Sequence, residues 1–233
     1  MLWLYNFYGR IDQEDESSKF MLQDFSHQRK QMMDRQLRAR DIEDARILTA
    51  FEEIPRHLFM PENMRPAAYE DRAIQIGFQQ TISQPFIVAY MIDLLDLRGS
   101  ERVLEVGTGS GYQAAILSRL AREVHTIELI PDLAERAAQV LAGIGVTNVF
   151  IHIGDGSQGW TNAAPYGAII VAAAGPRVPY SLLEQLADHG RMILPVGEPG
   201  FQKLELWRRE EDSFVQETLI PVAFVPLKGD EGV

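Results

Sequence analysis

Short apolar runs alternate with amphipathic stretches through the middle of the chain, and this alternation predicts its secondary structure. The apolar runs predict strands at 102–106, 124–129, 149–153, 167–172 and 191–196. Apolar positions at helical spacing predict helices at 112–121, 131–142 and 179–188. Gly190 is expected to end the last helix. Because strands and helices alternate with short connections, we expect a mainly parallel sheet covered by helices on both faces.

The two ends of the chain follow other patterns. Segments 203–209 and 214–222 flank an acidic turn with no helix between them, which predicts an antiparallel β-hairpin. Upstream of the alternating region, Asp41 is expected to cap a helix that ends at Pro55. Residues 57–81 then have the composition of a loop.

The composition is that of an ordinary globular protein. Of the 233 residues, 46% are hydrophobic and 24% are charged, so a single α/β domain can form its own core. The chain has no cysteine, which excludes disulfides, thiolate metal sites and thiol nucleophiles.

The net charge of −11 disfavours binding to a polyphosphate backbone. The densest basic stretch, between Arg29 and Arg40, is interrupted by Asp34 and has the pattern of an exposed helix face. No apolar run approaches the ~20 residues that span a bilayer, and no basic segment precedes the aromatic start. We therefore expect a cytoplasmic protein without nucleic-acid or membrane partners.

The strongest local motif joins the first strand of the alternating region to its helix. Gly107, Gly109 and Gly111 follow one another at every second position, which lets the backbone turn tightly and approach a ligand. A dinucleotide would require a wider glycine spacing, and Tyr112 stands where its last glycine belongs. Glu105 would also repel a pyrophosphate, whereas it suits the sulfonium and ammonium groups of S-adenosylmethionine.

Two more carboxylates follow the next two strands. Glu128 ends the second strand, where it can accept hydrogen bonds from ribose hydroxyls, a device that NAD sites also use. Asp155 follows the third strand, where it can accept a bond from an adenine amino group. Each acid alone has the pattern of surface charge. Together with Glu105 they predict one crevice at the carboxyl edge of the sheet.

Five segments in fixed order carry a resemblance to a known family. They are 81–85 (Thr-Ile-Ser-Gln-Pro), 103–112 around the glycines, 154–160 (Gly-Asp-Gly-Ser-Gln-Gly-Trp), 194–197 (Leu-Pro-Val-Gly) and 224–227 (Phe-Val-Pro-Leu). Over roughly residues 23–227 the chain resembles the protein-L-isoaspartate O-methyltransferases. The segment at 81–85 is more specific to them than the glycine loop.

The resemblance implies an α/β fold of the class I S-adenosylmethionine-dependent methyltransferases, which is Rossmann-like. Its mainly parallel sheet ends in a C-terminal antiparallel hairpin, and helices precede it. The implied activity is methyl transfer from S-adenosylmethionine, with S-adenosyl-L-homocysteine as product, to the free α-carboxylate of L-isoaspartyl residues. The ester then re-forms a succinimide, which starts the repair of damaged proteins and peptides.

The resemblance also assigns site residues. Ser83 is the implied active-site serine, and Val225, Pro226 and Leu227 join it in substrate binding. The implied cofactor-binding residues are Thr81, Ile82, Glu105, Gly107, Thr108, Gly109, Ser110, Gly111, Glu128, Leu129, Asp155 and Gly156. No metal ligands are expected. The residues alone leave a second role open for Ser83, as the N-cap of a helix that starts near Pro85.

The organisation implied is an N-terminal extension at 1–20 and one methyltransferase domain at 21–233. Within it we expect a helical part with the substrate loop at 21–100, the cofactor-binding core at 101–200 and the hairpin at 201–233. A monomer or weak oligomer is expected.

The chain departs from the family at Gln79, where many relatives carry a glycine, and this change is expected to stiffen the loop over the cofactor. A small-molecule carboxyl or O-methyltransferase, a non-catalytic peptide-binding relative and a dehydrogenase are the alternatives.

Overall fold

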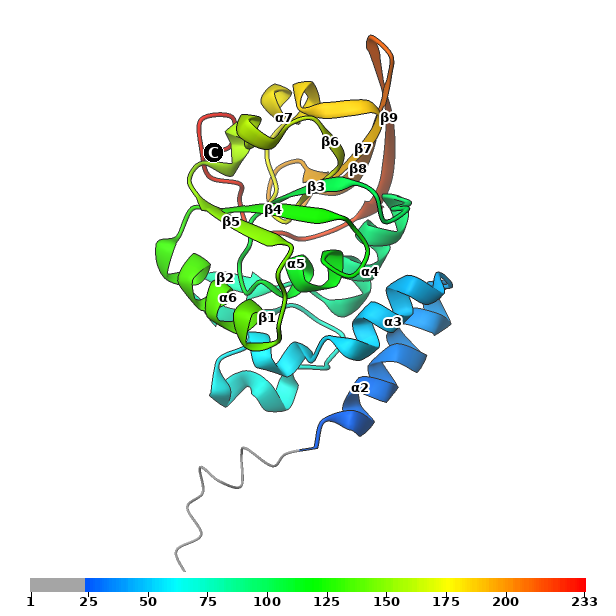
Figure 1. Ribbon diagram of the computed structural model, residues 1–233, viewed down its shortest axis with the longest axis vertical. Helices are drawn as coiled ribbons and strands as arrows, with labels where there is room; N and C mark the ends of the chain where they lie inside the picture. The colour runs from blue at the N-terminus through cyan, green and yellow to red at the C-terminus, as the bar shows by residue number, and fades with distance from the viewer. Residues whose placement is uncertain (1–23) are drawn as a thin grey trace, which may run out of the picture.

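The computed structural model describes residues 24–233, which form a seven-stranded sheet with helices on both faces (Figure 1). The extension expected at 1–20 lies outside the described residues. The strands of this sheet, in spatial order, are β5 (Val149–Ile153), β4 (Glu123–Glu128), β3 (Arg102–Val106), β6 (Tyr166–Val171), β7 (Leu186–Val196), β8 (Lys203–Glu210) and β9 (Ser213–Pro221).

The first five strands in this spatial order, β5, β4, β3, β6 and β7, run parallel to one another. Strands β8 and β9 each run antiparallel to the strand before them. The chain continues from β3 to one side through β4 and β5, then crosses to β6 on the other side. In open α/β sheets ligands bind outside the carboxyl ends of the strands at such a reversal. The expected parallel sheet with a C-terminal hairpin is therefore present.

Helices cover the two faces unequally. They are α2 (Ser26–Met32), α3 (Ala45–Glu53), α4 (Pro85–Leu94), α5 (Tyr112–Leu117), α6 (Pro131–Gly143) and α7 (Tyr180–Glu184). Side chains of α2 to α6 share one buried cluster with one face of the sheet, and α7 alone packs on the other (Figure 1).

None of the helices in residues 24–233 has the length and apolar character of a bilayer span.

Helix α7 is much shorter than the sequence predicted. It ends at Glu184, and β7 starts two residues later, so Gly190 lies inside a strand and not at a helix end. A Cβ at Gly190 would come within 2.8 Å of the Ala187 carbonyl oxygen, so close backbone packing requires this glycine. The prediction of a helix over 179–188 was therefore wrong beyond Glu184.

The region before the sheet also differs from expectation. Asp44, and not Asp41, caps α3, because its carboxylate accepts a hydrogen bond from the Arg46 N–H. Asp41 instead has a left-handed conformation after a short 3₁₀ helix. Within the expected loop, β1 (Ile74–Gly77) and β2 (Gln80–Ile82) form an antiparallel hairpin.

Candidate functional site

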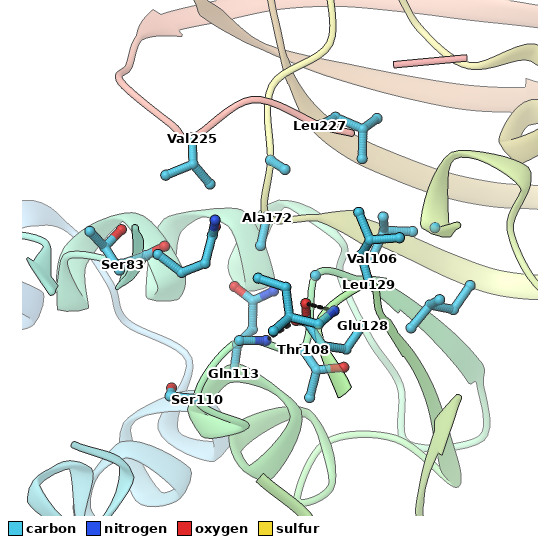
Figure 2. A pocket seen from close by; sticks show the side chains of 18 of the residues that line it. Ser83, Val106, Thr108, Ser110, Gln113, Glu128, Leu129, Ala172, Val225 and Leu227 are labelled. Atoms are coloured by element: carbon cyan, nitrogen blue, oxygen red, sulfur yellow. Dashed lines mark hydrogen bonds between the residues drawn. The ribbon is translucent and has the colours of Figure 1, made fainter. Parts of the chain in front are cut away.

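A cavity opens at the carboxyl ends of β3, β4 and β6, at the reversal of strand order (Figure 2). Thirteen of the predicted site residues line it: Thr81, Ile82, Ser83, Gly107, Thr108, Gly109, Ser110, Glu128, Leu129, Gly156, Val225, Pro226 and Leu227. Segments far apart in sequence therefore meet at one place. Figure 2 shows Ser83 at one end of the cavity and Leu129 at the other.

The glycine loop after β3 has a backbone that only glycine adopts without strain. The φ angles of Gly107, Gly109 and Gly111 are 93°, 53° and 85°. The loop is fixed to β4 because the N–H groups of Gly107 and Thr108 donate to the Ile127 carbonyl at 2.9 and 3.2 Å. Gly111 lies behind the cavity wall, where an added Cβ would be 3.0 Å from the Ala137 Cβ.

Glu128 is the carboxylate that lines the cavity, and it is almost fully buried. One of its oxygens accepts a 2.7 Å hydrogen bond from the Gly109 N–H, and the other a 2.9 Å bond from the Ile130 N–H. An ionised carboxylate has about four acceptor positions, so it can accept further bonds from a ligand. This placement suits the ribose role that the sequence predicts for Glu128.

Glu105 does not line the cavity but lies fully buried behind the glycine loop. The Thr126 hydroxyl donates a 2.6 Å hydrogen bond to one of its oxygens, and Thr126 in turn lies 2.7 Å from the Thr108 hydroxyl. Burial raises the pKa of Glu105 to about 8, so the side chain is mostly uncharged at pH 7. Direct contact of Glu105 with the cofactor stays a prediction.

Gln113 lines the cavity and was missed by the sequence reasoning. Its side-chain nitrogen and the second Glu105 oxygen are both buried and have no hydrogen-bond partner within residues 24–233. The only sequence signal was its position in the first turn after the glycine loop. The unpaired Gln113 nitrogen at the cavity wall fits a ligand with a carboxylate group, as S-adenosylmethionine has.

Asp155 does not line the cavity, although its neighbour Gly156 does. Its carboxylate accepts hydrogen bonds from the N–H and hydroxyl of Ser157 at 2.8 and 2.7 Å. It also accepts a 2.8 Å bond from the Asp230 N–H. The predicted bond from adenine to Asp155 stays a prediction, because the structure assigns three donors of the chain itself to this carboxylate.

Residues 228–233 form a strap beside the cavity. The Glu231 carboxylate accepts hydrogen bonds from the Tyr180 and Ser181 N–H groups, at 2.6 and 3.3 Å, at the start of α7. The Glu231 N–H donates to the Ser157 hydroxyl at 3.1 Å. Lys228, which begins the strap, lines the cavity and was not predicted.

A second groove meets the cavity at Ser83. Its walls come from the segment before β1, the start of α4 and residues 221–225, and it shares Thr81, Ser83, Ala172 and Val225 with the cavity. Ser83 is not a helix N-cap, since Gln84 holds that position and no side chain caps α4. The predicted N-cap role of Ser83 was therefore wrong. Ser83 instead lines both the cavity and the groove.

The substrate segment predicted at 225–227 is held by the chain beyond β6. The Ala174 N–H donates to the Val225 carbonyl, and the Leu227 N–H donates to the Ala174 carbonyl, both at 2.8 Å. This pairing fixes Val225 and Leu227 above the cavity, as Figure 2 shows.

Within residues 24–233, no three histidine or acidic side chains gather as metal ligands would.

Comparison with known proteins agrees with this geometry. The family model for protein-L-isoaspartate(D-aspartate) O-methyltransferase matches residues 27–232. Protein-L-isoaspartate O-methyltransferase 1 of Rhodopseudomonas palustris is 51% identical over 210 residues, which cover 89% of this chain and 86% of the relative. The enzyme of that name from a Roseiflexus species is 51% identical over 206 residues, covering 88% and 94%.

Solved structures agree with the fold. A protein-L-isoaspartate O-methyltransferase is 28% identical with a TM-score of 0.77, over 88% of this chain and 67% of that one. A Plasmodium falciparum structure titled as a putative member, in complex with S-adenosyl-L-homocysteine, is 24% identical with a TM-score of 0.74, over 86% and 98%. These neighbours confirm the predicted class I methyltransferase fold. The family match, which spans almost the whole described chain, shows that this chain belongs to the protein-L-isoaspartate(D-aspartate) O-methyltransferase family.

Proposed function

We propose that this chain transfers the methyl group of S-adenosylmethionine to the free α-carboxylate of an L-isoaspartyl residue, the first step in repairing that residue through a succinimide. The observation that carries the proposal is the junction of the cavity with the groove. Thr81, Ser83, Ala172 and Val225 belong to both. A cofactor in the cavity and an extended peptide in the groove would therefore meet at Ser83.

The reaction demands little acid–base chemistry from the protein. Bound S-adenosylmethionine supplies a methyl group on a positively charged sulfur, which is displaced as neutral S-adenosyl-L-homocysteine. The substrate carboxylate is ionised at pH 7, so it attacks without a general base. The chain's residues then have to align the carboxylate with the methyl group and exclude water.

The lining residues suit these tasks. Glu128 offers hydrogen-bond acceptors for the ribose, and residues 107–110 of the glycine loop line the same space. The Ser83 hydroxyl stands at the junction, where it can donate a hydrogen bond to the substrate carboxylate. Val225 and Leu227 cover the cavity opposite the loop (Figure 2). The roles of these residues are part of the proposal.

The proposal extends to the setting in which the chain works. Its partners are isoaspartyl-containing proteins and peptides. The net charge of −11 disfavours binding to the phosphate backbone of a nucleic acid. A cytoplasmic monomer or weak oligomer, without a membrane partner, and the domain division at 20, 100 and 200 stay predictions.

One comparison tests the proposal. The purified chain is given S-adenosylmethionine with an isoaspartyl peptide or with the aspartyl peptide of the same sequence, and ester formation is measured. Both peptides carry a carboxylate, so charge alone cannot separate them, but the free carboxylate hangs from Cα only in the isoaspartyl form. We expect roughly a hundredfold higher efficiency on the isoaspartyl peptide, since a misplacement of about 1 Å costs about that factor. Equal rates, or turnover of small acids only, would reject the proposal.

A further inference from the structure

Arg56 is a buried cation directly beneath the substrate side of the site. It begins the 3₁₀ helix Arg56–Phe59, and its side chain has no exposed surface. The groups of residues 24–233 that face its guanidinium are carbonyls and the rings of Tyr69 and Tyr112, with no carboxylate among them. Burial lowers the pKa of Arg56 to about 10, so the side chain stays charged at pH 7.

The guanidinium connects three segments of the site. Its Nε donates a 2.7 Å hydrogen bond to the Ala68 carbonyl, before β1. Its Nη2 donates a 2.7 Å bond to the Ser83 carbonyl, at the junction of cavity and groove. Its Cζ lies 4.9 Å from the centroid of the Tyr112 ring, which directly follows the glycine loop. One side chain thus touches both the substrate segment and the start of the cofactor-binding helix.

The Tyr112 ring is held in place by two neighbouring aromatic rings. It makes edge-to-face contacts with Phe51 and Phe59, at centroid distances of 6.0 and 5.5 Å. Ser83, in contrast, precedes α4 without capping it. The hydrogen bond from Arg56 to the Ser83 carbonyl therefore connects this segment, through the Tyr112 ring, to the helix that follows the glycine loop.

Burying the Arg56 guanidinium without a carboxylate partner costs free energy of folding. Even buried ion pairs can often be replaced by apolar side chains of similar volume without loss of stability, and a buried charge without a partner costs more. Only arginine offers several donors in a rigid planar fork, which two carbonyls on different segments require. The Nη1 group and the Tyr112 hydroxyl are neighbours, and neither has another hydrogen-bond partner within residues 24–233. The geometry of Arg56 points to alignment of the two halves of the site.

We propose that Arg56 is a positioning residue that sets the Ser83 segment against the glycine loop and thereby the discrimination between isoaspartyl and aspartyl substrates. This inference rests on the proposed function. Arg56 touches neither ligand in the structure and acts through Ser83 and Tyr112. Because a displacement of about 1 Å costs roughly a hundredfold in rate, losing one arm of the fork affects turnover more than cofactor binding.

Arg56→Lys is the decisive variant, because it keeps the charge but cannot bind both carbonyls with the arginine geometry. Calorimetric titration with S-adenosyl-L-homocysteine gives both the affinity and the fraction of functional sites, and kcat is expressed per functional site. We expect the affinity to stay within about threefold and kcat on the isoaspartyl peptide to fall at least about tenfold. The preference over the aspartyl peptide should fall as well.

Arg102→Lys is the matched control. Arg102 also donates to a carbonyl, that of Ala163 at 2.7 Å, and pairs with the Glu123 carboxylate, but it begins the central strand β3 at the end away from the cavity. We expect its kcat within twofold of the unaltered protein, as ordinary structural arginines should behave. Arg56→Gln, a neutral variant that can donate to one carbonyl, replaces Arg56→Lys if the lysine variant does not fold.

The outcomes separate this inference from the proposed function. If the unaltered chain does not prefer the isoaspartyl peptide, the proposed function fails. If it does, but Arg56→Lys keeps its kcat and preference, only the inference fails. Loss of S-adenosyl-L-homocysteine binding in the folded Arg56 variant would also overturn it, because Arg56 would then support the cofactor site as a whole.

Discussion

The Glu128 carboxylate accepts a 2.7 Å hydrogen bond from the backbone N–H of Gly109, so the acid at the end of β4 holds the glycine loop that follows β3. Its other oxygen accepts from the Ile130 N–H at the start of α6. Glu128 is therefore organised before any ligand arrives. A ligand that bonds to it meets a carboxylate whose position two backbone groups have already set, which lowers the entropy lost on binding.

Glu128→Ala should weaken cofactor binding strongly. Two charge-assisted hydrogen bonds to the ribose would be lost, at a cost of about 2–4 kcal/mol in binding free energy. Calorimetric titration with S-adenosyl-L-homocysteine measures this change. Glu135→Ala, on the exposed face of α6, should leave the affinity unchanged. An affinity loss below about threefold in Glu128→Ala would count against the ribose role.

Ser83→Ala should reduce turnover and leave both cofactor affinity and stability nearly intact. The hydroxyl is placed to donate to the substrate carboxylate, and a hydrogen bond to a charged group contributes about 1.5–3 kcal/mol. A tenfold to hundredfold lower kcat/KM is therefore expected in peptide methylation assays. Because Ser83 caps no helix, urea melts should not show the ~1 kcal/mol loss of a removed N-cap. Ser100→Ala, at an exposed position before β3, is the control.

The alternating part of the chain was predictable because local pattern and tertiary structure agree there. The strands at 102–106 and 149–153 have the predicted bounds, and α6 begins at Pro131 as expected. The glycine loop was predictable too, since its left-handed φ angles require the very residues that stand out in the sequence.

The hairpin of β1 and β2 escaped prediction for an equally physical reason. Its two-residue turn, Phe78-Gln79, has φ angles of 51° and 60°, a conformation that usually calls for asparagine and glycine. Here the Phe78 ring instead lies under the guanidinium of Arg136, with Cζ 5.2 Å from its centroid. Gln79, the expected departure from the family, thus occupies a position where glycine would be unstrained.

Long-range contacts account for the other differences. Asp155 bonds to Asp230, seventy-five residues later, and no local pattern announces such a pair. Glu105 was placed correctly at the end of a strand, but its burial depends on how the glycine loop folds over it. Sequence spacing gives the edge of the sheet at which a side chain lies, and packing decides whether it faces the cavity.

Glu105 should make the stability of the ligand-free protein fall as pH rises. Its folded pKa of about 8 exceeds the ordinary value of 4.5, so the native state retains a proton that the unfolded chain releases. The free energy of unfolding therefore declines between these values, by about 1.4 kcal/mol per pH unit, and levels off above pH 8. Glu105→Gln should flatten this slope in urea melts and stabilise the protein at pH 7 by roughly 3 kcal/mol. An unchanged slope would mean that the carboxyl is ionised in the fold.

A pair of histidines should make the protein sensitive to acid. His125 Nδ1 and His152 Nε2 lie 2.9 Å apart on β4 and β5, and His152 stacks on Trp160. Burial lowers the pKa of both rings below the ordinary 6.5, so the unfolded chain takes up protons first as pH falls. Stability is therefore fully present above pH 6.5 and is lost below it.

His152→Phe keeps the stacking on Trp160 but removes one titrating ring. Urea melts at pH 7, 6 and 5 should show a smaller loss of stability for this variant than for the unaltered chain. His189→Gln, at an exposed position, should behave like the unaltered chain. Parallel pH profiles for all three proteins would contradict the role of the pair.

The strap at the end of the chain gives the cavity a built-in reporter. The N–H groups of Asp230 and Glu231 donate to Asp155 and to Ser157, so their hydrogens exchange with solvent only when the strap lifts. Lys228, at the start of the same strap, faces the cavity. The exchange rates of these two amides therefore measure how often this wall of the cavity opens, and their slowing on addition of S-adenosyl-L-homocysteine would time the closing of the site without any chemical step.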